Sequence, residues 1–291
     1  MTSYLITGGS GFFGKAFTKR LLDSNASDRI CIFSRGEHAQ ADMRREFSGD
    51  KRLRFFIGDV RDQARLKRAM NGVDIVVHAA ALKRIEVGAQ NPVEMVKTNV
   101  DGAINVIEAS QDAGVNKVVA LSTDKAFEPV SPYGASKALA EALFLAANNT
   151  VGADGPQYSV CRYGNVWASA GSIVPLWRKM IESGANAVPT TNPDCTRFFM
   201  WIEEAVDLVL DTITTMPREI VIPKLPAYRV GDLATAMGVS MDVKGLPAWE
   251  KAHEGMGFGN TSDIARRMSV DELRSALAEV GFQPRILEAA E

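Results

Sequence analysis

The amino-acid sequence predicts an α/β fold in which helices cover both faces of a doubly wound parallel sheet, followed by a smaller C-terminal α/β lobe. Two observations support this prediction. Short apolar segments rich in β-branched residues alternate with segments of helical periodicity through the first half of the chain, as expected of repeated βαβ units. A glycine-rich loop follows the first apolar segment and opens a helix, which fixes where the first unit begins.

Six strands are expected in the sheet, and each is a short apolar run: Tyr4–Ile6, Ile30–Phe33, Leu53–Ile57, Asp74–Val77, Lys117–Leu121 and Tyr158–Cys161. After about Gly164 the alternation weakens into short strands, proline-rich turns and isolated helices such as 203–214 and 270–280. No Gly/Ser-rich linker separates the two halves. We therefore expect a first domain over residues 1–164 and a second lobe over 165–291, with segments that cross back to the first domain.

Composition excludes several classes of protein. The 291 residues contain 46% hydrophobic residues, which is enough for a full core, and the net charge of -2 leaves no basic field to hold a nucleic acid. The three cysteines, Cys31, Cys161 and Cys195, lie far apart and only three histidines accompany them, which argues against a disulfide framework and a metal site. No leader-like segment and no apolar run of roughly 20 residues is present, so we expect a soluble, cytoplasmic protein without a membrane span.

The loop Thr7–Gly14 has the glycine spacing of a dinucleotide-binding turn. It contains both GxGxxG and GxxGxxG between a strand and a helix, the context that separates this motif from an ordinary glycine-rich turn. Such glycines let the backbone approach a pyrophosphate, which the positive end of the helix dipole also attracts. The sequence thus predicts a Rossmann-type cofactor site with these contact residues: Gly8, Ser10, Gly11, Phe12, Phe13 and Gly14.

The end of the second strand favours NADP over NAD. An NAD site places Asp or Glu there to accept the ribose 2′-hydroxyl, whereas this chain has Ser34 and Arg35, which suit a 2′-phosphate. The alternative is a solvated arginine. Asp59 and Val60 follow the third strand, where the carboxylate is expected at the adenine amino group, unless Asp59 is a turn residue or a helix N-cap.

Small side chains follow the fourth strand. Ala79, Ala80 and Ala81 would let a cofactor lie close to the strand ends, and the start of a helix is the alternative. Asn99 interrupts an otherwise helical pattern over 93–108, and because asparagine is a mediocre helix former we expect it to serve a polar network at the cofactor.

Tyr133 and Lys137 are expected to share one face of a helix over 132–148, since their spacing is i, i+4. A tyrosine, with its ordinary pKa of about 10, acts as a base near neutral pH only where a neighbouring ammonium and a bound nicotinamide lower that value. A surface pair is the alternative. Both residues are expected to contact the cofactor as well.

Three polar residues follow the fifth strand at the edge where ligands bind in such sheets. Thr123 is expected to hydrogen-bond a substrate hydroxyl, Asp124 to donate a proton to a leaving group, and Lys125 to act as a base. Simple solvation of a loop is the alternative.

Together these motifs resemble the inverting UDP-N-acetylglucosamine 4,6-dehydratases, soluble members of the polysaccharide-biosynthesis branch of the extended short-chain dehydrogenase/reductases. The resemblance covers most of the chain and rests on Thr7–Gly14, Phe33–Arg35, Ala81–Lys83, Ser122–Ala126, Pro132–Lys137, Arg162–Val166, Thr196–Phe199 and Pro223–Arg229. Its sharpest element is the Asp-Lys pair nine and eight residues before the tyrosine. The related dTDP-glucose dehydratases have Asp-Glu and a longer gap.

The resemblance implies a dehydration with NADP as a transient hydride carrier. Tyr133 would remove the proton of the sugar 4-hydroxyl while hydride passes from C4 to NADP, and the resulting ketone acidifies the C5–H bond. Lys125 would then remove the C5 proton, Asp124 would protonate the departing 6-hydroxyl, and NADPH would return its hydride to C6. The membrane-bound retaining relatives carry methionine in place of the tyrosine, so the subclass that inverts C5 is implied.

The resemblance also implies a substrate site for UDP-N-acetylglucosamine, with Lys83 in the first domain and Asn165 and Arg197 in the mainly substrate-binding lobe over 165–291. Packing is the alternative role for Arg197. The chain departs from the family pattern at 169–172 and 245–251, where two expected cations are missing. A different nucleotide base, amino sugar or regiochemistry of dehydration therefore stays open.

Two other functions stay open from the sequence. An NADP-dependent nucleotide-sugar epimerase or ketoreductase would need Tyr133 and Lys137 but no acid–base pair at Asp124 and Lys125. A non-catalytic NADP-binding protein would not need the tyrosine and lysine at all. By analogy with such folds, we also expect a homodimer or higher homo-oligomer formed through the helices around 93–108 and 138–148.

Overall fold

The structure is a computed structural model, and it describes residues 2–152 and 154–283. These residues form two compact units. Unit 1 contains the residues up to Tyr163 together with Ile202–Pro223, and unit 2 contains Gly164–Trp201 and the residues from Lys224 onward. One segment of the C-terminal half therefore belongs to unit 1.

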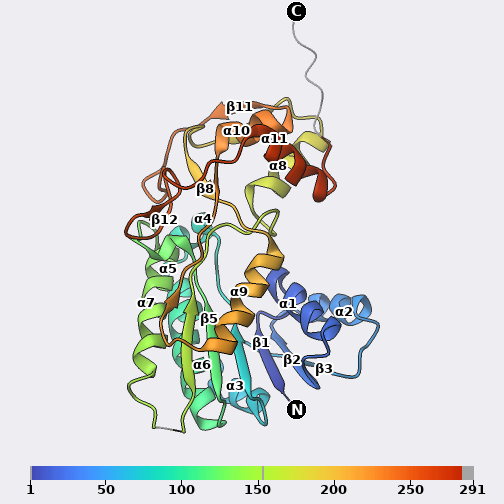
Figure 1. Ribbon diagram of the computed structural model, residues 1–291, viewed down its shortest axis with the longest axis vertical. Helices are drawn as coiled ribbons and strands as arrows, with labels where there is room; N and C mark the ends of the chain where they lie inside the picture. The colour runs from blue at the N-terminus through green and yellow to red at the C-terminus, as the bar shows by residue number, and fades with distance from the viewer. Residues whose placement is uncertain (1, 153, 284–291) are drawn as a thin grey trace, which may run out of the picture. The chain divides into compact units, whose positions relative to one another are not determined.

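Unit 1 is built around a seven-stranded sheet in which all neighbouring strands are parallel, in the order β3-β2-β1-β4-β5-β6-β9. The strands are β1 Ser3–Thr7, β2 Arg29–Ser34, β3 Leu53–Ile57, β4 Ile75–His78, β5 Lys117–Leu121, β6 Gln157–Cys161 and β9 Ile220–Val221. The predicted fold class is confirmed (Figure 1).

The strand order reverses at β1, which pairs with β2 on one side and with β4 on the other. In open α/β sheets a ligand binds outside the carboxyl ends of the strands that flank such a reversal. Thr7 ends β1 and His78 ends β4, and the two residues are register partners. The sheet topology therefore places the candidate site around these two residues.

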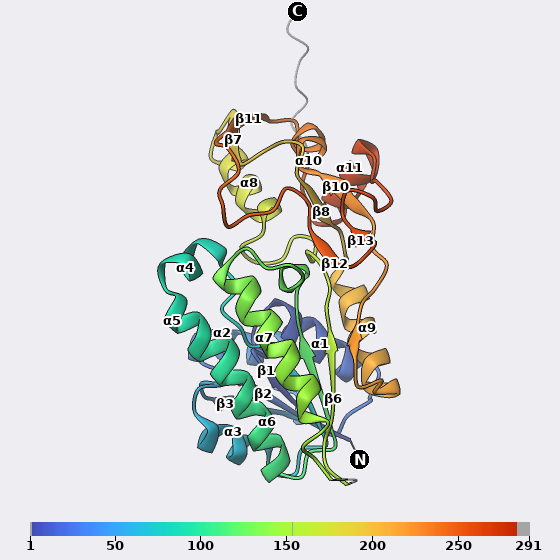
Figure 2. The same cartoon turned by 90° about the vertical axis from the view of Figure 1, so that its left-hand side faces the viewer.

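Helices cover both faces of the sheet (Figure 2). On one face α3, α6 and α7 pack side by side, and on the other α1 packs against α9. The helices are α1 Phe12–Asp23, α2 Glu37–Glu46, α3 Gln63–Met70, α4 Ile85–Gln90, α5 Pro92–Met95, α6 Gly102–Asp112, α7 Pro132–Ala147 and α9 Ile202–Thr215. The helix expected over 93–108 is interrupted by a π-helix at Val96–Asp101.

The inner strands β1, β4 and β5 are buried almost throughout because both faces of the sheet are covered. Leu5, Val76 and Val118 expose none of their surface, and Phe144 of α7 and Val106 of α6 close the same core. Burial of each such side chain contributes about 1.5–3 kcal/mol. This core holds the strand ends that carry the candidate site.

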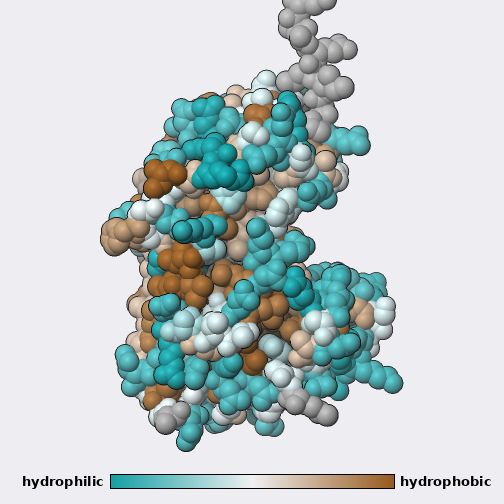
Figure 3. Space-filling view, in the orientation of Figure 1, coloured by the Kyte–Doolittle hydropathy of each residue, from teal (hydrophilic) through white to brown (hydrophobic). Residues whose placement is uncertain are grey.

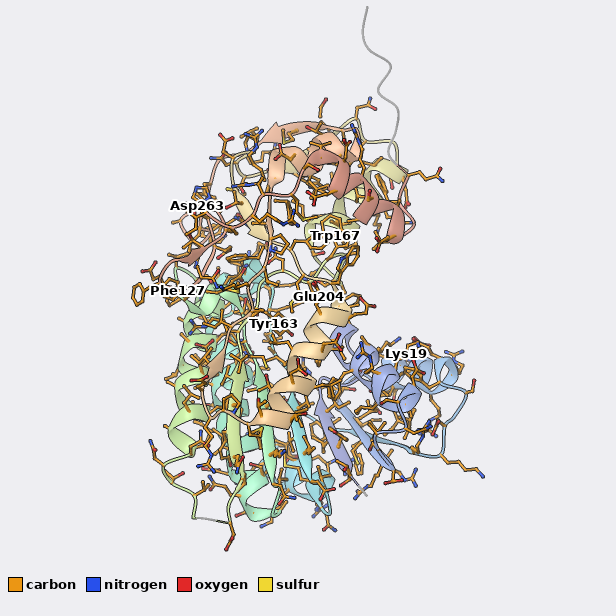
Figure 4. All side chains as sticks on the ribbon, viewed as in Figure 1. Lys19, Phe127, Tyr163, Trp167, Glu204 and Asp263 are labelled. Atoms are coloured by element: carbon orange, nitrogen blue, oxygen red, sulfur yellow. The ribbon has the colours of Figure 1, made fainter. Side chains whose placement is uncertain are left out.

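In its described residues, unit 2 combines three helices with three two-stranded sheets, β10-β8, β11-β7 and β12-β13. Its elements are α8 Ile173–Glu182, α10 Val230–Met237, α11 Val270–Glu279, β7 Ala187–Thr190, β8 Thr196–Phe198, β10 Ala227–Arg229, β11 Ser240–Val243, β12 Gly255–Gly257 and β13 Asn260–Thr261. Trp167 lies among its packed side chains (Figure 4). The expected N-cap of α11 is confirmed, because Ser269 and Glu272 form a capping box.

The surface over α1 and α2 is largely hydrophilic in the view of Figure 3. In α2 only Gln40 and Met43 are buried. Within the part of the chain that the structure describes, no helix has both the length and the apolar character needed to cross a bilayer.

Candidate active site

The glycine loop packs closely against neighbouring backbone, which it can do only because these positions lack side chains. A Cβ on Gly8, whose φ is 67°, would lie 2.9 Å from the amide nitrogen of Ala80. A Cβ on Gly14 would lie 2.3 Å from the carbonyl oxygen of Gly9. Gly11 caps α1 without a side-chain hydrogen bond, so the first N–H groups of this 12-residue helix are available to an anion. This cradle fits the pyrophosphate of a dinucleotide.

The two phenylalanines of the loop lie differently. Phe12 is exposed, whereas the ring of Phe13 stacks on Phe17 with centroids 5.6 Å apart. The side chain of Phe13 therefore packs against that of Phe17 within unit 1. A role for Phe13 in cofactor binding would therefore run through its backbone N–H, whereas the ring of Phe12 stays exposed.

Hydroxyl and guanidinium groups lie at the end of β2, as the sequence predicts. The Oγ atoms of Ser10 and Ser34 are 2.8 Å apart. Arg35 is half exposed and forms a loose ion pair with Asp59, at 3.7 Å. Arg61 contacts the same Asp59 oxygen at 2.7 Å, so Arg35 is the weaker partner of that carboxylate.

Asp59 and Val60 both sit in a turn after β3. Burial acts to raise the pKa of Asp59, but hydrogen bonds from Arg61 and the charge of Arg35 outweigh it and hold the pKa below the usual value. Asp62, and not Asp59, is the N-cap of α3, so that alternative for Asp59 was wrong. Val60 is buried, and its carbonyl oxygen accepts a hydrogen bond from Asn105.

Asn99 holds the loop that follows β4. Its side chain accepts a hydrogen bond from Leu82 N at 2.8 Å, donates to Leu82 O at 2.9 Å, and donates to Ser136 Oγ at 2.9 Å. Only 1% of Asn99 is exposed, so each of these bonds satisfies a group that water does not reach. The π-helix at Val96–Asp101 presents Asn99 to this network, in keeping with the association of π turns with functional sites.

Sequence reasoning missed a buried polar pair beneath Ala79–Ala81. Thr7 Oγ1 lies 2.8 Å from His78 Nδ1 and accepts a hydrogen bond from Ala80 N. Burial, with a smaller contribution from the charge of Lys137, lowers the pKa of His78 to about 3, so the imidazole is neutral. In the sequence, a histidine at the end of an apolar strand indicates only a buried residue. Its pairing with Thr7 could therefore not be predicted.

Tyr133 and Lys137 lie on the buried side of α7, with 9% and 5% of their surfaces exposed. Ser131 caps the helix by accepting a hydrogen bond from Gly134 N, and Pro132 occupies its first turn. The ammonium of Lys137 donates to Leu121 O at 2.6 Å, at the end of β5. Burial, partly opposed by the negative charge of Glu141, lowers the pKa of Lys137 to about 8.

The lowered pKa of Lys137 predicts a dependence of stability on pH. The unfolded chain binds this proton with the ordinary pKa of 10.5 and the folded protein with a pKa of about 8, so between these values the unfolded state carries more protons. Stability contributed by this residue therefore rises with pH across that window. Lys137→Met should raise the free energy of unfolding by about 2 kcal/mol at pH 7, after the lost hydrogen bond to Leu121 is counted.

Chemical denaturation of wild type and Lys137→Met at several pH values would measure this effect. The difference between the two proteins should shrink as the pH approaches 10.5, and other titrating groups cancel in that difference. A difference that is independent of pH would contradict the assignment of the low pKa to Lys137.

Thr123, Asp124 and Lys125 form a short turn directly after β5. The carboxylate of Asp124 is completely buried, accepts a hydrogen bond from Thr123 Oγ1 at 2.9 Å, and pairs with Lys125 Nζ at 3.1 Å. Asp124 N donates to Tyr163 O, which ties the turn to the residues after β6. The Lys125 side chain is 17% exposed. The turn thus holds an acid and an amine in one hydrogen-bonded pair.

Gly134 brings the acid–amine turn against the tyrosine helix. A Cβ at this position would lie 2.2 Å from the carbonyl oxygen of Lys125, well inside van der Waals contact. The turn at Asp124–Ala126 therefore packs directly against α7. The structure thus places side by side the two segments that carry the residues predicted as catalytic, namely Thr123, Asp124 and Lys125 in the turn and Tyr133 and Lys137 on α7, and their catalytic role stays a prediction.

Replacing Gly134 with alanine should therefore disturb this packing. We expect Gly134→Ala to lower the free energy of unfolding by about 2 kcal/mol, because backbone atoms must move to admit the methyl group. Urea denaturation would measure the change. Gly152→Ala is the matched control, since a Cβ there would have no neighbour within 4 Å. Equal stabilities for the two variants would contradict the close approach.

Comparison with known proteins identifies the family. Residues 4–268 match the model of a family described as polysaccharide biosynthesis protein. The chain belongs to this family. A Campylobacter jejuni protein named UDP-N-acetylglucosamine 4,6-dehydratase (inverting) is 47% identical over 263 residues, which span 89% of this chain and 78% of the relative. A Rickettsia conorii protein named UDP-glucose 4-epimerase is 43% identical over 244 residues, spanning 82% of this chain and 71% of the relative.

Solved structures agree with the fold of this polysaccharide biosynthesis family member. Pen from Bacillus thuringiensis is 28% identical, with a TM-score of 0.90 over 96% of this chain and 97% of that one. DesIV, a dTDP-glucose 4,6-dehydratase from Streptomyces venezuelae solved with NAD and TYD bound, is 23% identical, with a TM-score of 0.78 over 98% of this chain and 92% of that one. The second likeness supports the Rossmann-type fold alone.

The predicted substrate residues divide between the two units. Lys83 is exposed in unit 1. It follows Leu82, whose backbone N–H donates a hydrogen bond to Asn99. In unit 2, Asn165 is half-buried and Arg197 of β8 is buried. The guanidinium of Arg197 donates to Glu250 at 2.5 Å and to Ala252 O at 3.0 Å, so it already has partners within unit 2. Substrate binding by these three residues stays a prediction.

A buried ion pair beside the site was also missed. Arg162 donates through Nε and Nη2 to the two carboxylate oxygens of Glu141 on α7. Tyr163, next in the chain and visible in Figure 4, is buried, and burial raises its pKa, with a further contribution from Tyr133. Glu141 follows Lys137 by one helical turn, but this spacing does not indicate its partner Arg162, which follows β6.

Proposed function

We propose that this protein is a nucleotide-sugar 4,6-dehydratase that converts UDP-N-acetylglucosamine to a UDP-4-keto-6-deoxy sugar with inversion at C5. The observation that carries the proposal is the Asp124–Lys125 pair, held at 3.1 Å and packed against the helix of Tyr133. An oxidation and reduction at C4 alone needs the tyrosine and lysine of α7. Elimination of water also needs an acid and a base, and this pair supplies both.

The proposed cofactor is NADP. The glycine cradle at the N-terminus of α1 would hold its pyrophosphate, and Ser34 with Arg35 would hold its 2′-phosphate. Ser122 Oγ at the end of β5 is buried without a hydrogen-bond partner among the described residues, which leaves one more polar atom for a ligand to satisfy. When bound, the nicotinamide accepts hydride from C4 of the sugar and returns it at C6.

The protein supplies the proton transfers. Tyr133 takes the proton of the 4-hydroxyl, and the ammonium of Lys137 on the next helical turn stabilises the phenolate that this requires. The hydrogen bond from Lys137 to Leu121 O fixes the ammonium at the end of β5. The C4 ketone stays in the product, so Tyr133 releases the proton of the 4-hydroxyl to solvent, and C5 takes up one proton from solvent after C6 has been reduced.

The acid–amine pair explains how one turn performs both halves of the elimination. A shift of one proton from Lys125 to Asp124 converts the ion pair into a neutral amine and a carboxylic acid, without exchange with solvent and without a change in net charge. The amine then takes the C5 proton, and the acid gives its proton to the departing 6-hydroxyl, which leaves as water. Both residues return to the ion pair observed at 3.1 Å.

Similarity to the Campylobacter jejuni dehydratase supports this assignment. The 43% identity to a protein named UDP-glucose 4-epimerase supports a second candidate, an NADP-dependent epimerase. An epimerase would return hydride to C4 and would leave C5 and C6 untouched. Chemistry at C5 and C6 therefore separates the two functions.

Incubation of the purified protein with UDP-N-acetylglucosamine in deuterated water, followed by NMR, tests the proposal. We expect a 4-keto-6-deoxy product that carries deuterium at C5 and the inverted configuration there. Conversion to the C4 epimer without deuterium would establish the epimerase instead. Deuterium and retained configuration would support dehydration and contradict inversion.

We also propose that the protein self-associates through the face formed by α5, the π-helix and α7. These elements pack against one another, and each exposes a large apolar residue: Val93 is 61%, Val96 48% and Leu139 51% exposed. A monomer gains nothing from exposing large apolar side chains on elements that pack together. Light scattering should give a dimer or larger species, and Val93→Asp with Leu139→Asp should give the monomer. An unchanged mass would exclude this face.

A further inference from the structure

We propose that Gln40 is a positioning residue that sets the preference for NADP over NAD by orienting the hydroxyl groups of Ser34 and Ser10. The inference rests on the proposed cofactor and concerns a residue that does not touch it. Gln40 lies on α2, is only 5% exposed, and contacts Ser34 at the end of β2. Its role follows from the direction of its hydrogen bonds.

The amide group of Gln40 can lie only one way round. Its Nε2 is 2.9 Å from Phe56 O, 3.0 Å from Ser34 O and 2.9 Å from Ser34 Oγ. Two of these atoms are backbone carbonyl oxygens, which only accept hydrogen bonds. The nitrogen, and not the oxygen, of the amide must therefore face them.

This orientation controls the proton of the Ser34 hydroxyl. An amide nitrogen does not accept a hydrogen bond, so Ser34 cannot donate to Gln40 and must direct its proton away from α2. The nearest acceptor there is Ser10 Oγ, at 2.8 Å. If Ser34 donates to Ser10, the proton of Ser10 points outward; if Ser10 donates to Ser34, the proton of Ser34 does. In both cases the pair offers one O–H donor to a ligand.

A donor at this point favours a phosphate over a hydroxyl. The 2′-phosphate of NADP has only acceptor oxygens at neutral pH, and the guanidinium of Arg35 lies on the next residue. The 2′-hydroxyl of NAD is bound best by a carboxylate, and the end of β2 carries none. Asp59, the nearby carboxylate, is engaged by Arg61 at 2.7 and 3.0 Å. Gln40 thus ensures that the hydroxyl pair of Ser34 and Ser10 presents a hydrogen-bond donor to the ligand.

Binding of adenine nucleotides tests the inference without reference to catalysis. Calorimetry on the full-length protein would compare 2′,5′-ADP with 5′-AMP, which differ only in the 2′-phosphate, and NADP with NAD. In Gln40→Glu the carboxylate accepts the Ser34 proton and adds a negative charge. We expect the preference for the 2′-phosphate to fall by roughly tenfold or more, the scale of a hydrogen bond to a charged group.

Gln40→Met covers the case in which the carboxylate, facing two carbonyl oxygens, prevents folding. It donates no hydrogen bond and frees the Ser34 proton to turn towards Phe56 O, so the preference should fall roughly threefold or more. Gln90→Glu makes the same chemical change at an exposed position and should leave the preference intact.

The outcomes separate the inference from the function on which it rests. An unchanged preference in folded Gln40→Glu, or in Gln40→Met if that variant alone folds, would overturn the role of Gln40. An equal loss of affinity for both members of each nucleotide pair would do the same, because it would show a purely structural role. A wild-type protein that binds neither dinucleotide, or that prefers NAD, would overturn the proposed cofactor itself.

Discussion

Tyr133→Phe is expected to abolish the reaction at its first step. The phenyl ring fills the same buried space on α7, but it has no oxygen to take the proton of the 4-hydroxyl. Loss of a general base of this kind lowers the rate by roughly 10²–10⁴-fold. Because the ketone at C4 never forms, neither reduced nicotinamide nor deuterium at C5 should accumulate. Stopped-flow absorbance and NMR in deuterated water would measure the two quantities on the same sample.

Tyr158→Phe is the matched control for this substitution. Tyr158 of β6 is also buried, and its hydroxyl is 3.0 Å from Ser110 Oγ and 3.3 Å from Ile107 O. Its removal should lower the free energy of unfolding by about 1 kcal/mol and leave turnover unchanged. Turnover by Tyr133→Phe within a few-fold of wild type would remove the tyrosine from the proposed mechanism.

Lys125→Met is expected to stop the reaction one step later. The first oxidation needs only the groups of α7, so reduced nicotinamide should still form in a single turnover. Deuterium should not enter C5, and turnover should fall by roughly 10²–10⁴-fold, because no amine is present to take the C5 proton. The contrast between formation of reduced nicotinamide and exchange at C5 distinguishes this variant from Tyr133→Phe.

Lys125→Arg separates chemistry from electrostatics. Methionine leaves the buried carboxylate of Asp124 without its cation, which by itself destabilises the turn. Arginine keeps a positive charge beside Asp124 but does not give up its proton, so it cannot serve as a base. We expect Lys125→Arg to fold like wild type and to remain inactive. Recovery of C5 exchange with arginine would show that the charge, and not proton transfer, is what the reaction needs.

The sequence predicted six of the seven strands of the sheet, because strands buried on both faces form long apolar runs; the two-residue β9 was missed. A strand covered by helices on both sides must be apolar throughout, and β2 and β5 are such runs. The glycine spacing was informative for a similar reason, since Gly8 and Gly14 stand where a Cβ would meet backbone atoms. These features follow from local steric and hydrophobic rules.

The features that the sequence did not predict depend on contacts between distant residues. The pairing of Thr7 with His78 joins residues 71 apart, and that of Glu141 with Arg162 joins residues 21 apart. Gln40 looked like one more polar residue on a charged helix until the structure placed it against Ser34 and Phe56. Periodicity reports which face of an element is buried, but it does not report which polar atom lies opposite.

The π-helix also escaped prediction, because its residues still fit a helical pattern. Asn99 was expected to serve a polar network, and it hydrogen-bonds to Leu82 and Ser136. What periodicity missed is the extra residue in the turn that carries Asn99. Intrinsic preference and tertiary contacts disagree at this point, and the tertiary contacts decide the local geometry.

The wide turn at Val96–Asp101 makes the arrangement of unit 1 sensitive to chain length rather than to side-chain chemistry. A π turn holds about one residue more than an α turn, so deleting one residue here would let the turn relax to ordinary helix and would change the local position from which Asn99 reaches the loop after β4. The loop after β4 would lose the hydrogen bonds between Asn99 and Leu82, although no functional group had been removed. A single missing codon could thus disable the protein while every residue with a chemical role stays in place.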